Sequence, residues 1–538
     1  MNSHHESPSG KATLSDALDL RLKGGAAEEA IMGPIAIDAE SVADHIERHR
    51  HDPEKRNKWF EALRPTWEAM DLSAGSKGAL AKLQDPDCRV VMTGQQPALW
   101  GGPLLCMMKL LAATRLVADL EGRGIPAVAL FWIADDDHDT GELDPGWFRS
   151  RSKVINPFPR GKVPISSLSL SEEQESATER LRAAIEAAPA ASDLLKRIDD
   201  EVSSVSSPSQ QFVKILQMLA PDESWLPVFP KLLRTLQWPW IERAAKDTSQ
   251  FQSWVSAASD EQLAQGIPAP VKVRGGAPFF FVDSAGERVR PEKSKEYSQE
   301  NLIELKDRLS ADALLRSVVQ DGIFEPAAVV LGVTEWCYTL QTREVRRAWQ
   351  VSQPLWLPRP SLRPLEAELV EHFRELGVSV ERLSPELDIA NVIPSPRGQL
   401  KGLELDQAVA EILQRLKELE DGDMANPALR RRARRLSLQW QRQLEALKVA
   451  IDHGLDRDVE ARRHRLRDML QQAFPSGKEQ ERCRNLLDLV AWHGEEVISQ
   501  AKEQITAAIT RWDGAVKPWI LPSLNVTCEE EDSDATPS

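Results

Sequence analysis

The 538-residue sequence is poor in cysteine and has no long hydrophobic run. Its five cysteines are odd in number, widely scattered and without a Cys-x-x-Cys pair, which argues against a disulfide framework and a structural zinc site. The longest uninterrupted apolar run, Ile125–Ala134, has about ten residues, whereas a membrane-spanning helix needs about 20. The N-terminus lacks the basic and apolar segments of a secretory signal. These absences favour a reduced, cytoplasmic protein that does not enter a membrane.

The chain also has fewer positively than negatively charged residues. The chain has 67 Lys and Arg residues against 83 Asp and Glu residues, a formal net charge of −16. Nucleic acids and anionic membranes are polyanions, so this balance argues against either as a general partner. The hydrophobic share of 41% is ordinary for a globular protein, and the length predicts about three to four domains at roughly 150 residues each.

Local patterns divide the chain into regions. Residues 1–14 are predicted to be a flexible N-terminus, and residues 15–402 an α/β core that starts with helices and has a helical insertion near 170–210. Residues 403–515 are predicted to be a helical coiled-coil domain, residues 516–527 a segment that returns to the core, and residues 528–538 an acidic disordered tail. The coiled coil is expected because apolar residues recur at heptad-like spacings: Leu429, Ala433, Leu436, Trp440, Leu444, Leu447 and Ile451.

Two short apolar runs that flank a helix determine the predicted fold class. Arg89–Thr93 and Ala127–Ile133 are predicted strands, and Leu104–Leu120 has the apolar periodicity of a helix. The pattern returns in a further strand, helix and strand: Ala327–Gly332, Thr334–Arg347 and Leu355–Pro358. Strands that alternate with helices in this way are typical of an α/β fold with a parallel sheet.

A glycine-rich loop, Gly94–Pro103, joins the first strand to its helix, and Pro103 suits a first helical turn. Ligands of open α/β sheets bind outside the carboxyl ends of strands, near helix N-termini that favour anions. Six residues there suit close approach or hydrogen bonding: Thr93, Gly94, Gln95, Gln96, Gly101 and Gly102. The loop matches neither a dinucleotide-binding fingerprint nor a P-loop, so a tight turn without a ligand is an equal alternative. By pattern alone, Lys109 is an ordinary surface lysine.

An acidic run with one histidine, Asp135–Asp139, follows the second strand. Four carboxylates in five residues repel one another unless a cation is near. His138 is the only histidine between residues 52 and 371, and the acids are expected to raise its pKa, making it a charged donor or shaping it as a base. The run could bind Mg²⁺ or the ammonium group of an amino sugar or amino acid. Capping of the next helix is the alternative without function.

Three later segments place polar side chains near strand ends. Arg316–Gln320 precedes a strand, and Glu335, Tyr338 and Gln341 follow it at i, i+3 and i+6, near one helix face. Pro358–Arg359 ends the next strand. An arginine at such a position is typical of a carboxylate or phosphate clamp, although surface arginines are also common.

Together these motifs resemble the bacillithiol biosynthesis cysteine-adding enzymes. That family follows approximately T-G-Q-Q-x-G-L-x-x-G-P-L-x-x-x-x-K and then F-W-x-A-x-E-D-H-D-x-x-E. This sequence has the matching residues Thr93–Pro97, Gly102–Leu104, Lys109, Phe131–Ala134, Asp137–Asp139 and Glu142. Further matches are Arg316 with Gln320, Glu335 with Tyr338 and Gln341, Pro358–Arg359, and Phe474–Asn485 for F-P-x-G-x-x-Q-E-R-x-x-N. The resemblance therefore covers nearly the whole chain.

The resemblance implies a Rossmann-like core, helical insertions and a C-terminal coiled coil that forms a homodimer. It implies a ligase that joins cysteine to the amino group of glucosaminyl-malate in the last step of bacillithiol synthesis. ATP, with ADP as a possible product and Mg²⁺ as its ion, is the expected driver of amide formation. Asp137, His138 and Asp139 are then the expected catalytic residues, and Arg316 and Arg359 the clamp for an anionic group such as malate. The loop residues, Lys109, Glu335, Tyr338 and Gln341 are expected to bind substrate or nucleotide.

Some positions depart from the family pattern. Ala98 and Ser317 stand where the family has glycine and proline, and Asp136 replaces a glutamate. The segment Leu331–Glu335 lacks two of the family's turn glycines. Two alternatives therefore stay open: a diverged nucleotidyl-transferase or ligase acting on another amino sugar or amino acid, and a non-catalytic coiled-coil scaffold.

Overall fold

The computed structural model describes residues 14–149, 156, 158, 161–170, 174–202, 204–273, 275–291, 299–394, 410–415, 417–418 and 427–521. These residues belong to two compact units, one formed by the chain up to Pro364 and from Gln480 onward, the other by Leu365–Glu479. The units differ from the predicted boundaries at 402 and 515, because residues after 480 pack into the hydrophobic core of the α/β unit. The predicted acidic tail and residues 1–13 of the predicted flexible N-terminus lie outside the described residues.

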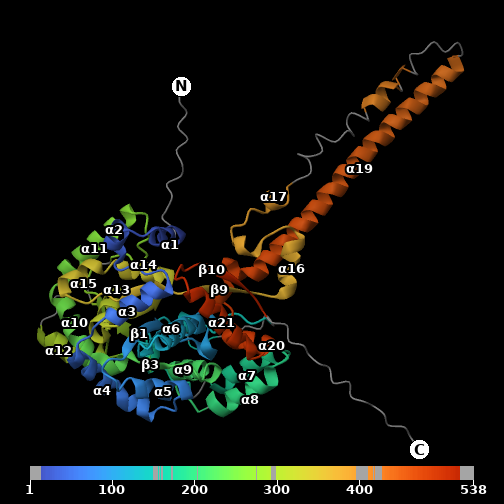
Figure 1. Ribbon diagram of the computed structural model, residues 1–538. Helices are drawn as coiled ribbons and strands as arrows, with labels where there is room; N and C mark the ends of the chain where they lie inside the picture. Colours follow the sequence, from blue (N-terminus) through green and yellow to red (C-terminus); the bar gives the residue numbers. More distant parts are fainter. Residues whose placement is uncertain are drawn as a thin grey trace, which may run out of the picture. The chain divides into compact units, whose positions relative to one another are not determined.

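A five-stranded parallel sheet lies at the centre of the first unit (Figure 1). Its order is β3-β2-β1-β7-β8, and every neighbouring pair is parallel. The strands are β1 (Arg89–Gln95), β2 (Ala127–Ile133), β3 (Trp225–Val228), β7 (Ala328–Leu331) and β8 (Leu355–Pro358). The predicted apolar runs are therefore confirmed as strands. The chain winds outward from β1 in both directions, so the β1–β7 boundary is the switch point at which ligands bind in Rossmann-like folds.

The strands are near-continuous apolar runs because helices cover both faces of the sheet. Alternate residues enter two separate cores: Val91 and Ala129 lie in one, and Val90 and Leu130 in the other. The first core includes α6 (Leu105–Gly122), α9 (Pro208–Leu219), α20 (Leu486–His493) and α21 (Glu496–Ile509). The second includes α4 (Pro53–Ala69), α10 (Arg234–Lys246), α11 (Thr248–Ala264), α13 (Ala313–Phe324), α14 (Val333–Leu340) and α15 (Arg343–Trp349).

The remaining elements of this unit surround the sheet. The N-terminal helices are α1 (Leu14–Lys23), α2 (Ala26–Met32), α3 (Ala39–Arg48) and α5 (Ala74–Lys82), and the predicted helical insertion contains α7 (Gln174–Ile185) and α8 (Ala191–Val202). A small antiparallel sheet has the order β5-β4-β6, with β4 (Phe279–Val282), β5 (Arg288–Val289) and β6 (Leu309–Ala311), and α12 (Gln299–Leu305) precedes β6. The last strand, β10 (Val516–Ile520), pairs with β9 (Ser361–Leu365).

The second unit contains α16 (Ala367–Glu375), α17 (Ile389–Val392) and a 47-residue helix, α19 (Pro427–Ala473). The predicted heptad-like segment is thus one long helix. Residues 410–415 and 417–418 are also helical, and the rest of the predicted first arm lies outside the described residues. Leu436 and Trp440 are about half exposed, and the coiled coil stays a prediction. No described helix has both the length and the apolarity needed to cross a membrane.

Candidate active site

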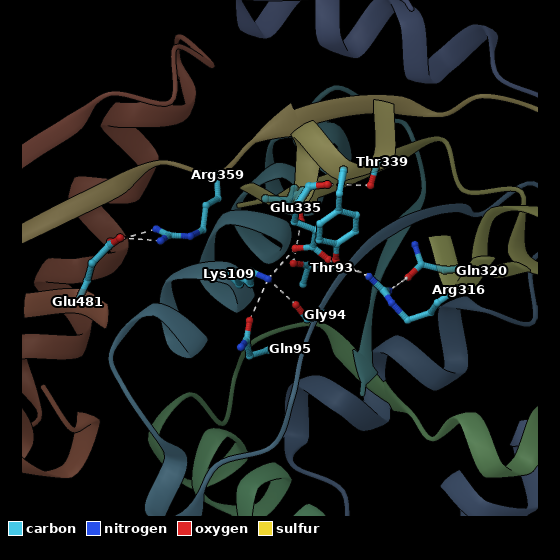
Figure 2. Close-up of polar contacts among 12 residues, drawn as sticks. Thr93, Gly94, Gln95, Lys109, Arg316, Gln320, Glu335, Thr339, Arg359 and Glu481 are labelled. Atoms are coloured by element: carbon cyan, nitrogen blue, oxygen red, sulfur yellow. Dashed lines mark hydrogen bonds and ion pairs between the residues drawn. The ribbon is translucent and has the colours of Figure 1, made fainter. Parts of the chain in front are cut away.

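The carboxyl ends of β1 and β7 bring together a group of buried and partly buried polar side chains, here called the lysine cluster (Figure 2). Its members are Gln95, Lys109, Arg316, Glu335 and Tyr338. Lys109 Nζ donates to Gly94 O at 2.6 Å, to Gln95 Oε1 at 3.0 Å and to Glu335 Oε2 at 2.8 Å. An ammonium group has three N–H donors, so Lys109 uses all of them. The side chain is only 7% exposed, so Lys109 is not the surface lysine that its pattern suggested.

The helices that follow the strands explain this convergence. Lys109 lies early in α6, directly after the loop from β1, and Glu335 lies in the first turn of α14, directly after β7. Both first turns therefore sit above the carboxyl edge of the sheet, and the N-terminus of α14 favours a carboxylate. Burial alone would raise the pKa of Glu335, but Lys109 and Arg316 outweigh burial and lower it. Glu335 is thus held as an anion between two cations.

Arg316, from α13, completes the lysine cluster. Its guanidinium donates to Glu335 Oε1 at 3.2 Å, to Tyr338 Oη at 2.9 Å and to Gln320 Oε1 at 3.2 Å (Figure 2). Two cations share one carboxylate, so the lysine cluster has an excess of one positive charge. That excess favours an anionic group nearby.

A second group, here called the Asp–His cluster, follows β2. Gln96 Nε2 donates to Asp137 Oδ2 at 2.7 Å, and Arg288 donates to Asp137 Oδ1 and to His138 Nδ1, both at 3.1 Å. A guanidinium only donates, so His138 Nδ1 accepts and the neutral ring carries its proton on Nε2. The side chains of Asp137 and His138 are 35% and 30% exposed, which makes this cluster far more accessible than Lys109.

The expectation that neighbouring acids raise the pKa of His138 was wrong. Burial and Arg288 lower this pKa and together outweigh the opposing effects of Asp137 and Asp139. The sequence analysis missed Arg288 because it lies in β5, 150 residues after His138. Phe280 of β4 was also missed, and its ring lies 5.8 Å from the His138 ring. A lone basic residue between short strands gives no local signal of such a role.

The other acids of the run have separate partners. Asp136 forms a bidentate ion pair with Arg234, in which Arg234 Nη1 lies 2.6 Å from Asp136 Oδ2. Asp139 Oδ1 accepts from Gly141 N at 3.0 Å and caps the next turn, as the alternative without function predicts. Asp135 is 3% exposed, and burial followed by repulsion from Asp136 raises its pKa to about 7. Within the described parts of the chain, no group of three His, Cys, Asp or Glu side chains is placed to hold a metal ion.

Arg359 lies in an ion pair of its own beside the lysine cluster (Figure 2). Its guanidinium donates to Glu481 Oε2 at 3.0 Å and to Oε1 at 2.5 Å, and both side chains are almost fully buried. Ser361 Oγ and Leu362 N also donate to the Glu481 carboxylate. Arg359 was expected to be an open clamp for an anion, but the structure gives it a buried internal partner.

The loop after β1 is fixed in place by contacts with the chain near residue 485. Asn485 Nδ2 donates to the carbonyl oxygens of Gly102 at 3.3 Å and Pro145 at 2.5 Å, and Pro103 forms an isolated β-bridge with Asn485. Gly102 has φ +66°, and a Cβ there would lie 2.6 Å from Ala98 Cβ. Thr93 Oγ1 donates to Val330 O at 2.9 Å and so fastens β1 to β7. These residues shape the site rather than present free groups.

Gln341 does not join the lysine cluster. The predicted helix Thr334–Arg347 is in fact two helices, and Gln341 lies at the break between α14 and α15. Its side-chain amide donates to Val271 O and Ser259 Oγ at 2.8 Å, and its oxygen accepts from Val271 N at 3.1 Å. Gln341 therefore fastens the segment around Val271, whereas Glu335 and Tyr338 face Arg316.

Comparison with known proteins identifies the family of this chain. Residues 35–360 match the family model "Bacillithiol biosynthesis BshC, N-terminal Rossmann-like domain", a range that contains both clusters. The protein named "Putative cysteine ligase BshC" from Solibacter usitatus is 25% identical over 342 residues, or 61% of this chain and 63% of that protein, slightly under two thirds of its length. Proteins of the same name from Bacillus cereus strain AH187 and Salinibacter ruber are 22% identical over 466 residues and 25% identical over 360. These matches cover 80% and 61% of this chain, and 84% and 64% of the relatives.

Proposed function

Because this chain belongs to the BshC family of bacillithiol biosynthesis, we propose that it is a ligase that joins the carboxyl group of cysteine to the amino group of glucosaminyl-malate. The relatives are named as cysteine ligases, which supports an enzyme rather than a scaffold. The observation that carries the proposal is the pairing of the two clusters at one edge of the sheet. Gln95 binds Lys109 and Gln96 binds Asp137, so adjacent residues at the end of β1 and directly after it connect a cationic group with an accessible Asp–His pair.

The Asp–His cluster suits the amino group and the carbonyl that must react. Asp137 is a partly exposed carboxylate that can accept a hydrogen bond from the substrate ammonium and take the proton that this nitrogen must lose before it attacks; the C–N bond then forms as the activated carboxyl oxygen leaves with its phosphate-containing group. His138 carries its proton on Nε2 and can donate it as a hydrogen bond to the carbonyl oxygen, where negative charge develops. Arg288, bound to both residues, fixes their orientation.

The lysine cluster suits the anionic part of the reaction. A free carboxylate does not form an amide without activation, and ATP is the proposed source of that activation. The excess positive charge of Lys109 and Arg316 over Glu335 would hold a phosphate or carboxylate group near the carboxyl end of β1. Mg²⁺ would then arrive with the nucleotide, since this ion is usually held by substrate phosphates together with one or two carboxylates. The long helix α19, with its exposed Leu436 and Trp440, is the proposed homodimer contact.

The proposal is tested by mixing purified protein with glucosaminyl-malate, cysteine and ATP–Mg²⁺, omitting ATP in a parallel arm, and following the thiol product by mass spectrometry. We expect product in the ATP arm and a fall of about 10²-fold or more for Asp137→Asn and His138→Gln. Asp144→Asn is the matched control, since Asp144 is exposed and only caps Gly146, and it should keep the wild-type rate. No product from folded wild-type protein in either arm would refute the ligase reaction. Wild-type rates in both site variants would refute the site.

A further inference from the structure

A cavity of about 530 Å³ lies among α11, the start of α13 and the segment that contains Val271. This volume is within the range of small-molecule pockets, roughly 300–1,000 Å³. None of the residues that line it belongs to the lysine cluster or the Asp–His cluster. Its wall is largely apolar and includes Phe251 and Val255 of α11 and Leu314 of α13. An apolar wall of this kind suits a ring or a short hydrocarbon chain.

The lining of this cavity also contains charged side chains. Arg290 and Lys272 line the cavity together with a single acid, Asp312. Asp312 is already engaged, because its Oδ1 caps α13 through Leu314 N at 3.2 Å and Leu315 N at 3.0 Å. Its other oxygen lies 3.7 Å from Arg290, too far for a strong hydrogen bond. The positive charge of Arg290 and Lys272 is therefore only partly balanced.

The cavity is coupled to the Asp–His cluster through one aromatic ring. Arg288 and Arg290 alternate along the same chain segment, and their guanidinium carbons lie 3.8 Å and 4.3 Å from the centre of the Phe280 ring. Arg288 binds Asp137 and His138, whereas Arg290 lines the cavity. A group bound at Arg290 would thus lie one ring away from the residues proposed to catalyse the reaction.

We propose that this cavity is a binding site for an anionic amphipathic small molecule, whose apolar part lies against α11 and α13 and whose carboxylate or phosphate group binds Arg290. The assignment goes beyond the ligase reaction, because it depends on the cavity and its charges and not on which amide is formed. Cation–π contact with Phe280 holds the Arg290 guanidinium in place, so less freedom is lost when an anion binds.

Two fluorescent probes of similar size test the assignment: 8-anilinonaphthalene-1-sulfonate, which is anionic, and N-phenyl-1-naphthylamine, which is neutral. On the full-length protein we expect saturable binding at one site, with the anionic probe at least about tenfold tighter. Arg290→Gln should remove that preference, and Val273→Trp, which fills the cavity from a partly exposed position, should abolish binding of both probes. Neither Arg290 nor Val273 belongs to either cluster, and probe binding is measured without substrates, so its outcome is independent of ligase activity.

Two matched variants control for non-specific binding. Arg123 is 39% exposed against 40% for Arg290, and it also pairs with one aspartate, so Arg123→Gln should leave probe affinity unchanged. Leu263 is a 53% exposed apolar residue of α11 outside the cavity, and Leu263→Gln should likewise have no effect. Unchanged binding in Val273→Trp, or equal affinity for the two probes in the wild type, would overturn the assignment. So would loss of binding in the two control variants to the same extent as in Arg290→Gln.

Discussion

Asp135 makes a sharp prediction about stability and pH. The ordinary pKa of an aspartate is 3.8, whereas burial and Asp136 raise that of Asp135 to about 7. The folded state therefore binds more protons than the unfolded state between these values, and this group lowers stability as pH rises from about 4 to about 7. Relative to an aspartate with the ordinary pKa, Asp135 lowers the free energy of unfolding by roughly 2 kcal/mol at pH 5 and by roughly 4 kcal/mol at pH 8. Asp135→Asn removes the titration while keeping the shape of the side chain.

The assay is urea unfolding followed by tryptophan fluorescence at pH 5 and pH 8. Trp440 is the single tryptophan of Leu365–Glu479, so the signal reports mainly on the unit that contains Asp135. We expect the free energy of unfolding of the Asn variant, minus that of wild type, to be about 2–3 kcal/mol larger at pH 8 than at pH 5. Comparing the two pH values cancels any constant difference in hydrogen bonding between Asn and Asp.

A control variant separates this effect from a general change of charge. Asp119 is partly exposed on α6 and pairs with Arg123 in the neighbouring turn, so Asp119→Asn should change stability by less than about 0.5 kcal/mol at either pH. An Asp135→Asn variant whose relative stability is the same at both pH values would refute the reasoning. It would mean that Asp135 is ionised throughout this range or reaches water more freely than its 3% exposure indicates.

Three further substitutions test the buried contacts. Lys109→Met removes one of the two cations that hold the Glu335 carboxylate and leaves Arg316 as the other, so it should lower the free energy of unfolding by about 1–3 kcal/mol. In a urea double-mutant cycle, Glu335→Gln should cost less in the Lys109→Met background than in wild type. Glu481→Gln leaves the Arg359 charge buried and should cost about 3–5 kcal/mol by the same assay, whereas a loss below about 1 kcal/mol would show that water reaches the pair. Asn485→Ala removes the donors to the loop carbonyls, so we expect a loss of about 1–3 kcal/mol and faster limited proteolysis; unchanged proteolysis would contradict this bracing role.

Much of the sheet could be predicted from the sequence, because local patterns encode it. Parallel strands covered on both faces are continuous apolar runs, and Ala127–Ile133 and Leu355–Pro358 were located to the residue. The helix that spans Thr334–Arg347 was predicted as one element, since its apolar periodicity continues across the break. At the break lies Gln341, whose side chain binds Val271 some 70 residues away. A contact between residues so far apart in the sequence does not change the local apolar periodicity.

The sequence predicted which residues belong to the candidate site but not which contacts they make. Motif resemblance selected Lys109, Glu335, Asp137 and His138, and the structure does bring these residues to one edge of the sheet. It could not supply Arg288, which together with burial reverses the expected direction of the His138 pKa shift. A pKa depends on every charge within several ångströms, and half of that environment comes from a separate antiparallel sheet.

The two adjacent glutamines after Gly94 explain how one strand can serve both clusters. Consecutive residues of an extended chain point their side chains to opposite faces. Gln95, the last residue of β1, therefore reaches Lys109 on α6, and Gln96 reaches Asp137 beyond the end of β2. Two consecutive glutamines at this position can therefore orient a buried cation on one side and an accessible carboxylate on the other. Moving the pair by a single residue would exchange the two faces and separate both contacts.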